Sequence, residues 1–180
     1  TQIEGGTISF DFVFDPWSIT LNNDDPDNST IINLNVLLTS DVYLDGRTLK
    51  KNGEWNTICL PFDVTLEGSV LEGATAKTLT NATMVGSHVT LTFGDAVTTL
   101  EAGVPYIIKW DDGENIVNPM FSNVTIKKTT EEERTITKAD GNVKFIGYFD
   151  AFDITATDND IYYMIARSEE RRVGKEWRSR

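Results

Sequence analysis

Residues 49–62 of this 180-residue chain read Leu49-Lys50-Lys51-Asn52-Gly53-Glu54-Trp55-Asn56-Thr57-Ile58-Cys59-Leu60-Pro61-Phe62. An Asn-Gly pair readily adopts the positive φ angles of a hairpin turn, so Asn52-Gly53 predicts a tight turn. The β-prone run from Trp55 to Leu60 predicts a strand after that turn, and Pro61 ends it because proline has no N–H for the strand ladder. A second turn dipeptide, Asp45-Gly46, lies just upstream. The sequence therefore predicts short antiparallel strands joined by tight hairpins.

Apolar and polar residues alternate with a period of two on both sides of this stretch. The alternation is clear in residues 8–14, 32–38 and 89–93, and further β-prone runs lie at 104–110, 120–126, 143–148 and 161–165. Such alternation places every second side chain on one face of a half-buried strand. Helical signal is confined to a turn or two near residues 64–71 and to the charged end of the chain. Roughly nine or ten short strands with turn chemistry between them predict an all-β fold, either an antiparallel β-sandwich or a partly closed barrel.

The composition is that of one soluble, folded domain. Hydrophobic residues make up 39% of the chain and charged residues 24%, values that indicate neither a membrane protein nor a disordered one. We expect residues 1–167 to form a single β-sandwich domain. Its predicted core contains Phe10, Phe12, Trp55, Ile58, Leu60, Tyr106 and Ile108.

The net charge of −12 excludes one class of partner. A strongly acidic surface repels the phosphate backbone, so we expect no nucleic acid to bind. No run of residues approaches the roughly 20 apolar residues of a membrane-spanning helix. The first residues also lack the basic and apolar regions of a signal peptide, so we expect the signal of an exported precursor to lie outside this numbering.

Residues 168–180 differ in composition from the rest of the chain. They hold five basic and three acidic residues, with Val173 and Trp177 as the only large apolar ones. A segment this charged supplies no strand to an apolar core. We expect it to be a foreign, read-through tail that does not belong to the fold.

The turn-and-strand stretch resembles a largely uncharacterised β-rich domain of secreted and cell-surface proteins of Bacteroidetes. The pattern of that family is R-x-L-x-K-x-G-x-W-N-T-L-C-L-P-F, and residues 47–62 follow it except that Ile58 replaces the leucine. Residues 71–74, 100–110 and 117–126 also agree, so the resemblance covers roughly residues 42–165. It implies an extracellular or cell-surface location and no catalytic motif. Family members continue with more strands, so we expect a C-terminally truncated domain that is one module of a longer chain.

Two side chains, Cys59 and His88, are candidates for reactive groups. For both, a structural role is the favoured interpretation. Cys59 lies in an apolar run, where a buried cysteine acts as a small hydrophobic residue. His88 is the only histidine, which leaves no second imidazole for a zinc site and no G-x-S-x-G motif for a serine nucleophile. We expect His88 to be an exposed residue at the end of a strand, and the protein not to be an enzyme.

Four carboxylates are weak candidates for binding calcium. Calcium takes carboxylate and carbonyl oxygens, and acidic residues alternate in two turn-like segments, at Asp25 and Asp27 and at Asp158 and Asp160. Solvated turns are the favoured interpretation of both, because Asp and Asn readily bond their own backbone. We expect no other metal or cofactor.

Three aromatic residues are candidates for stacking on a sugar, namely Trp17, Trp110 and Tyr106. Core packing accounts for most aromatic residues.

The sequence as a whole favours a non-catalytic, extracytoplasmic β-sandwich module with a structural, adhesive or protein-interaction role, whose partner is a protein or a glycan. A carbohydrate-binding module is the alternative. A glycan-acting hydrolase domain with two facing carboxylates ranks third.

Overall fold

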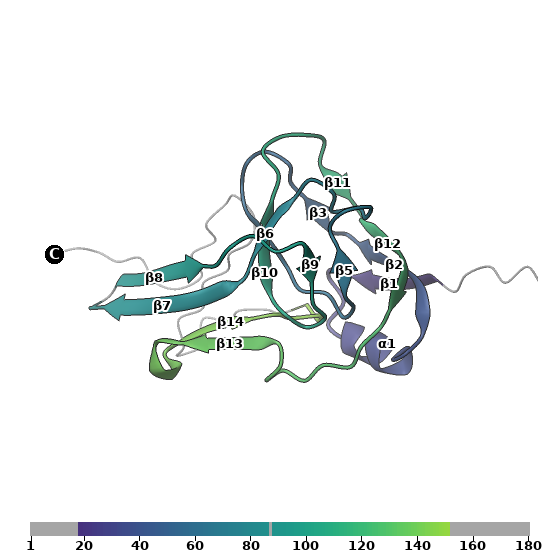
Figure 1. Ribbon diagram of the computed structural model, residues 1–180. Coiled ribbons are helices and arrows are strands. Elements are labelled where there is room, and N and C mark those ends of the chain that lie inside the picture. The colour runs from purple at the N-terminus through teal and green to yellow at the C-terminus, as the bar shows by residue number, and fades with distance from the viewer. Residues whose placement is uncertain (1–17, 87, 152–180) are drawn as a thin grey trace, which may run out of the picture.

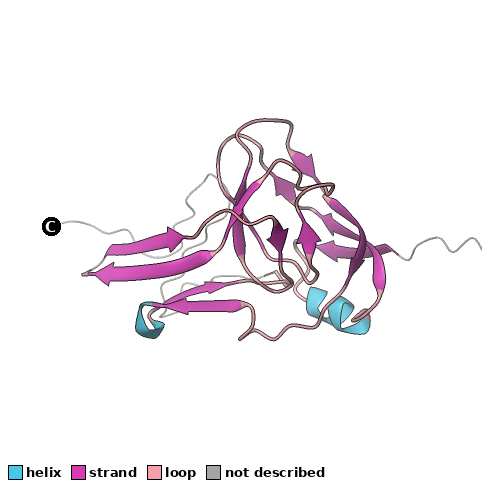
Figure 2. Cartoon of the chain, viewed as in Figure 1, coloured by secondary structure: helices cyan, strands magenta, loops and turns pink. Residues whose placement is uncertain are grey.

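The computed structural model describes residues 18–86 and 88–151, and these form many short strands with little helix (Figures 1 and 2). The helical elements are α1 (Asn28–Leu34) and the 3-10 turn η1 (Ala139–Gly141). The strands are β1 (Ser18–Asn22), β2 (Thr39–Asp45), β3 (Thr48–Leu49), β4 (Asn56–Ile58), β5 (Val64–Thr65), β6 (Thr75–Lys77), β7 (Leu79–Val85), β8 (His88–Phe93), β9 (Thr99–Leu100), β10 (Tyr106–Lys109), β11 (Ile116–Val117), β12 (Met120–Thr125), β13 (Thr135–Lys138) and β14 (Val143–Ile146). The predicted all-β fold is confirmed.

The described strands are divided among small sheets of two or three strands each. The two largest have the orders β1-β2-β12 and β4-β10-β6, and the other pairs are β3–β11, β5–β9, β7–β8 and β13–β14. All pairings are antiparallel except β1 with β2. Closure of these sheets into a sandwich or a barrel stays a prediction.

Both predicted turns are present, but neither forms a hairpin between its flanking strands. Gly46 and Gly53 have φ angles of 72° and 82°, the left-handed conformation that glycine adopts without steric cost. The strands beside them pair elsewhere, however: β2 with β1 and β12, β3 with β11, and β4 with β10. Local chemistry therefore located the turns correctly and the strand partners wrongly.

The predicted strand at residues 32–38 is wrong, because helix α1 continues to Leu34 and a turn follows it. Ile32 is 3% exposed while Leu34 is 78% exposed, so the two side chains do not share one buried strand face. The helix begins at Asn28, a buried side chain whose Nδ2 donates to the carbonyl oxygens of Asn22 and Phe149, at 2.7 and 2.8 Å. These bonds satisfy a buried side-chain amide at the first residue of the helix. The short helical signal expected near residues 64–71 is also absent, and β5 followed by turns occupies that part of the chain.

One apolar core joins the two three-stranded sheets. At its centre Phe62 packs on Phe121 with ring centroids 5.2 Å apart, and both side chains are almost completely buried. Of the predicted core residues, Ile58, Leu60, Tyr106 and Ile108 are confirmed. Phe10 and Phe12 lie outside the described residues. Trp55 is 36% exposed and does not belong to the core, so that part of the prediction is wrong.

Two hairpins extend from this core on the same side of the molecule, as Figure 1 shows. They are β7–β8 and β13–β14, and they meet at Phe93 and Phe145, whose rings form an edge-to-face contact at 6.0 Å. Among the described residues no helix is long and apolar enough to cross a membrane.

Replacing Phe62 with alanine tests the assignment of the core. The substitution removes a fully buried ring and leaves a cavity against Phe121, so we expect the free energy of unfolding to fall by about 3–5 kcal/mol. Urea denaturation followed by circular dichroism measures the loss. Val117→Ala is the control, because Val117 is 65% exposed and should change stability by less than about 0.5 kcal/mol. Equal stabilities of the two variants would contradict the core.

Candidate functional site

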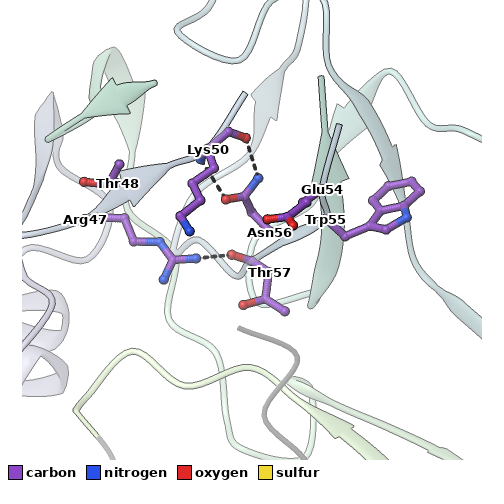
Figure 3. Close-up of a pocket in the computed structure, with 7 residues that line it drawn as sticks. All are labelled: Arg47, Thr48, Lys50, Glu54, Trp55, Asn56 and Thr57. Carbon is purple, nitrogen blue, oxygen red and sulfur yellow. Dashed lines mark hydrogen bonds between the residues drawn. The ribbon is translucent and has the colours of Figure 1, made fainter. Parts of the chain in front are cut away.

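The residues that resemble the Bacteroidetes pattern also line a surface pocket of about 270 Å³ (Figure 3). Its lining consists of Arg47, Thr48, Lys50, Glu54, Trp55, Asn56 and Thr57. The sequence predicts a turn and a strand in this stretch. In the structure it also forms a polar hollow with a tryptophan on its border.

Asn56 holds the walls of this pocket together. Its side-chain Oδ1 accepts the backbone N–H of Lys50 at 2.8 Å, and its Nδ2 donates to the backbone oxygen of Lys50 at 2.9 Å. The same Nδ2 lies 3.3 Å from the carbonyl oxygen of Ile108 in β10. Asn56 is 8% exposed, so these bonds satisfy a buried amide and tie the residues after β3 to the central strand β10.

Trp55 points outward because side chains alternate between the two sides of an extended chain. Asn56 and Ile58 are buried on the core side of β4, so Trp55 and Thr57 belong to the opposite side of the chain. This is why Trp55 could not join Ile58 in the core. The Nζ of Lys109 lies 5.3 Å from the centroid of the Trp55 ring, within the range of a cation–π contact.

Two basic side chains and one acid surround the hollow. The guanidinium of Arg47 donates to the backbone oxygen of Thr57, and Figure 3 shows the Lys50 ammonium on the same side, while the Trp55 indole projects away from both. Glu54 accepts a hydrogen bond from the side-chain amide of Asn52 at 3.0 Å. A glycosidase of the usual kind needs two carboxylates, and this pocket contains one.

The two described candidates for sugar stacking are buried, and their rings offer little surface for a sugar. Trp110 is 4% exposed, its Nε1–H donates to the backbone oxygen of Glu72 at 2.9 Å, and the Nζ of Lys51 lies 5.5 Å from its ring centroid. Tyr106 is also 4% exposed, and its hydroxyl accepts the N–H of Glu101 at 3.1 Å. Burial raises the pKa of Tyr106. Trp17, the third candidate, lies outside the described residues.

The described calcium candidates have neighbours within their own turn. Asp25 accepts the backbone N–H of Asp27 at 2.9 Å, and Asp27 accepts the hydroxyl of Thr30 at 2.7 Å. Over residues 18–86 and 88–151 no group of three or more acidic, histidine or cysteine side chains is arranged to hold a metal ion. Asp158 and Asp160 lie outside those ranges. Solvated turns stay the favoured interpretation of these segments, and calcium binding stays the alternative.

A second surface feature was not found from the sequence. The hairpin β7–β8 pairs Ala82 with Leu91 and Met84 with Val89, so these four side chains share one face. Met84 is 48% exposed, Val89 41% and Leu91 37%. The signal was available, because residues 78–94 form the longest stretch of the chain without Asp, Glu, Lys or Arg. We call the exposed face formed by Met84, Val89 and Leu91 the hairpin face.

Comparison with protein-family models, with curated proteins and with solved structures found no match to the chain. The structure places this chain in the class of all-β proteins. Its resemblance to surface proteins of Bacteroidetes stays a prediction.

Cys59 and His88 have the kinds of environment that the sequence predicts. His88 is exposed at the start of β8. Cys59 is largely buried, and burial raises the pKa of its thiol to about 12, although Arg134 acts in the opposite direction. A thiol with this pKa is almost entirely protonated at neutral pH and therefore a poor nucleophile.

Alkylation of Cys59 by iodoacetamide tests this environment. Only the thiolate reacts, and an unfolded cysteine has a pKa near 8.5, so we expect folded protein at pH 8 to react at least about 100-fold more slowly than protein in urea. Mass spectrometry over time measures both rates. Free cysteine in the same urea solution is the control for the reagent. Similar rates for folded and unfolded protein would show that Cys59 is accessible and ionisable.

Proposed function

We propose that this chain is a non-catalytic interaction module of a bacterial surface or secreted protein, and that it binds protein through the hairpin β7–β8. The location is supported by the resemblance of residues 42–165 to domains of secreted and cell-surface proteins of Bacteroidetes. The binding role is supported by the exposure of the hairpin face. Large apolar side chains gathered on one exposed surface are typical of interaction sites.

The composition of the hairpin is the observation that carries this proposal. The chain has 28 acidic and 16 basic residues, yet residues 78–94 contain none of them. Interface centres are depleted of charged side chains because burying a charge against a partner costs free energy. The hairpin extends away from the core, so a partner can reach it without contacting the acidic body first (Figure 1).

A non-catalytic role is consistent with the surroundings of the reactive side chains. His88, the only imidazole in the sequence, is exposed on β8. The raised pKa of Cys59 disfavours the thiolate that nucleophilic catalysis needs. Glu54 is the one carboxylate in the pocket.

Selection from a phage-displayed library of random peptides tests the interaction role. We expect the folded protein to enrich uncharged peptides that alternate apolar and β-branched residues, because these match the hairpin in chemistry and spacing. Leu91→Lys should weaken their binding about tenfold or more, since it places a charge in the apolar surface. The matched control is Val117→Lys, which adds the same charge at an exposed position on β11. Binding constants from biolayer interferometry decide the matter, and equal affinities of the wild type and Leu91→Lys would exclude the hairpin as the binding surface.

Carbohydrate binding at the pocket is the second candidate, and the exposed indole of Trp55 favours it. Sugar rings stack on exposed tryptophan, and the polar lining offers hydrogen-bonding groups beside it. The volume of about 270 Å³ is close to the lower end of roughly 300–1,000 Å³ for ligand pockets. A small saccharide unit at the end of a longer glycan is the ligand class that fits.

Isothermal titration calorimetry with a panel of neutral and acidic oligosaccharides tests this candidate. If one of them binds, Trp55→Ala should lower its affinity about tenfold or more, because stacking contributes roughly 1–3 kcal/mol by analogy with base stacking on aromatic side chains. Trp55→Phe is the matched control, since it retains an aromatic face and should retain part of the affinity. The absence of any bound saccharide, or full affinity in Trp55→Ala, would rule out this pocket.

A further inference from the structure

Strand β8 presents an edge for pairing. The residues from His88 to Thr92 are exposed, and β8 pairs only with β7 among the described strands. Strand β7 also lies against β13 and η1. We call β8, which has no second pairing partner among the described strands, the outer strand of the hairpin. An outer strand carries backbone N–H and C=O groups that point away from its single neighbour. These groups are a template for a further strand.

Native proteins usually protect such an edge, and the described residues of β8 lack three of the common devices. Protection comes from charged side chains, proline or a bulge that twists the edge away. The sequence from His88 to Phe93 contains no lysine, arginine, acid or proline. The register shift in the hairpin lies between Leu79 and Asn81, on β7 rather than on β8. An unprotected, uncharged edge is expected where strand pairing is functional.

The charge distribution limits contact between two copies of this chain to the hairpin. Two bodies of net charge −12 repel one another, which opposes most ways of bringing two copies together. The uncharged hairpin is where that repulsion is weakest. Antiparallel pairing of two outer strands also places the base of each hairpin beside the tip of the other, so the two acidic bodies lie at opposite ends of the shared sheet.

The sequence of β8 is self-complementary in one register. A two-fold axis at Leu91 pairs Leu91 with its own copy, Thr90 with Thr92, and Val89 with Phe93. The two side chains of each pair lie on the same face of the sheet, because residues directly opposite each other in paired strands point the same way. Threonine pairs and pairs of an aromatic with a β-branched side chain stabilise antiparallel sheets. The apolar face then continues from one copy to the next.

We propose that β8 pairs antiparallel with β8 of a second copy, about a two-fold axis at Leu91, to form the four-stranded sheet β7-β8-β8-β7. The proposal rests on the interaction role proposed above and names a partner for the β8 edge of the same hairpin. A two-fold contact is self-limiting, because each copy uses the same edge of β8 and that edge is then occupied.

Charge exchange at Leu91 tests both the dimer and its register. Sedimentation velocity of the full chain over a range of concentrations should show a wild-type dimer. Leu91→Lys and Leu91→Glu should each raise the dissociation constant at least about tenfold, because like charges lie directly opposite at the axis. An equimolar mixture of the two variants should restore the dimer, since lysine then faces glutamate. Restoration also shows that both variants fold.

Met84→Lys is the matched control, because Met84 has similar exposure on the same face but lies on the inner strand β7. It should leave the dimer intact. A wild-type chain that stays monomeric at every concentration would overturn the proposal. So would a mixture of the two charged variants that stays monomeric, or a Met84→Lys variant that dissociates as far as Leu91→Lys.

The two proposals on this hairpin fail separately. Peptide selection measures binding of a foreign strand, and sedimentation measures binding of a second copy. A monomer that enriches peptides in a Leu91-dependent manner retains the interaction role and excludes the dimer. Loss of both results would remove the interaction role as well.

Discussion

The buried amide of Asn56 is the interaction on which the organisation of the site depends. It bonds the backbone of Lys50 in both directions and reaches the carbonyl oxygen of Ile108. A buried side-chain amide without partners costs roughly 1–3 kcal/mol, so the chain has a strong reason to keep these bonds. Through them one side chain fixes the loop after β3 against the central strand β10.

Several features of the surface follow from that constraint. With Asn56 directed inward, the alternation of strand β4 directs Trp55 and Thr57 outward. Trp55 then meets Lys109 from the neighbouring strand, and Thr57 accepts the guanidinium of Arg47 through its backbone. A stretch that looks like scaffold in the sequence thus has two roles. Its inward residues build the core and its outward residues build the pocket.

The hairpins show the consequence of dividing a fold among small sheets. Each two-stranded sheet has two edges, and a hairpin with one apolar face needs something to cover it. Phe93 against Phe145 covers the base of β7–β8, and Ala82 near the middle of β7 is buried. Further out, Met84 and Val89 are only partly covered. The hairpin is therefore tied to the core at one end and offers an apolar surface at the other.

The sequence by itself determined the strand-rich class, the positions of the glycine turns and much of the core. These depend on local chemistry, because a positive φ angle, a period of two and β-branched side chains are properties of neighbouring residues. It also predicted the inert environment of Cys59 and the exposed position of His88. Only the tertiary structure decided which strands pair, since partners such as β2 and β12 are far apart along the chain. Another long-range contact holds the start of the helix Asn28–Leu34, where Asn28 bonds to Phe149. Long-range contacts also buried Trp110 and exposed Trp55, because the side of a strand that meets the core is set by its partners rather than by its own residues.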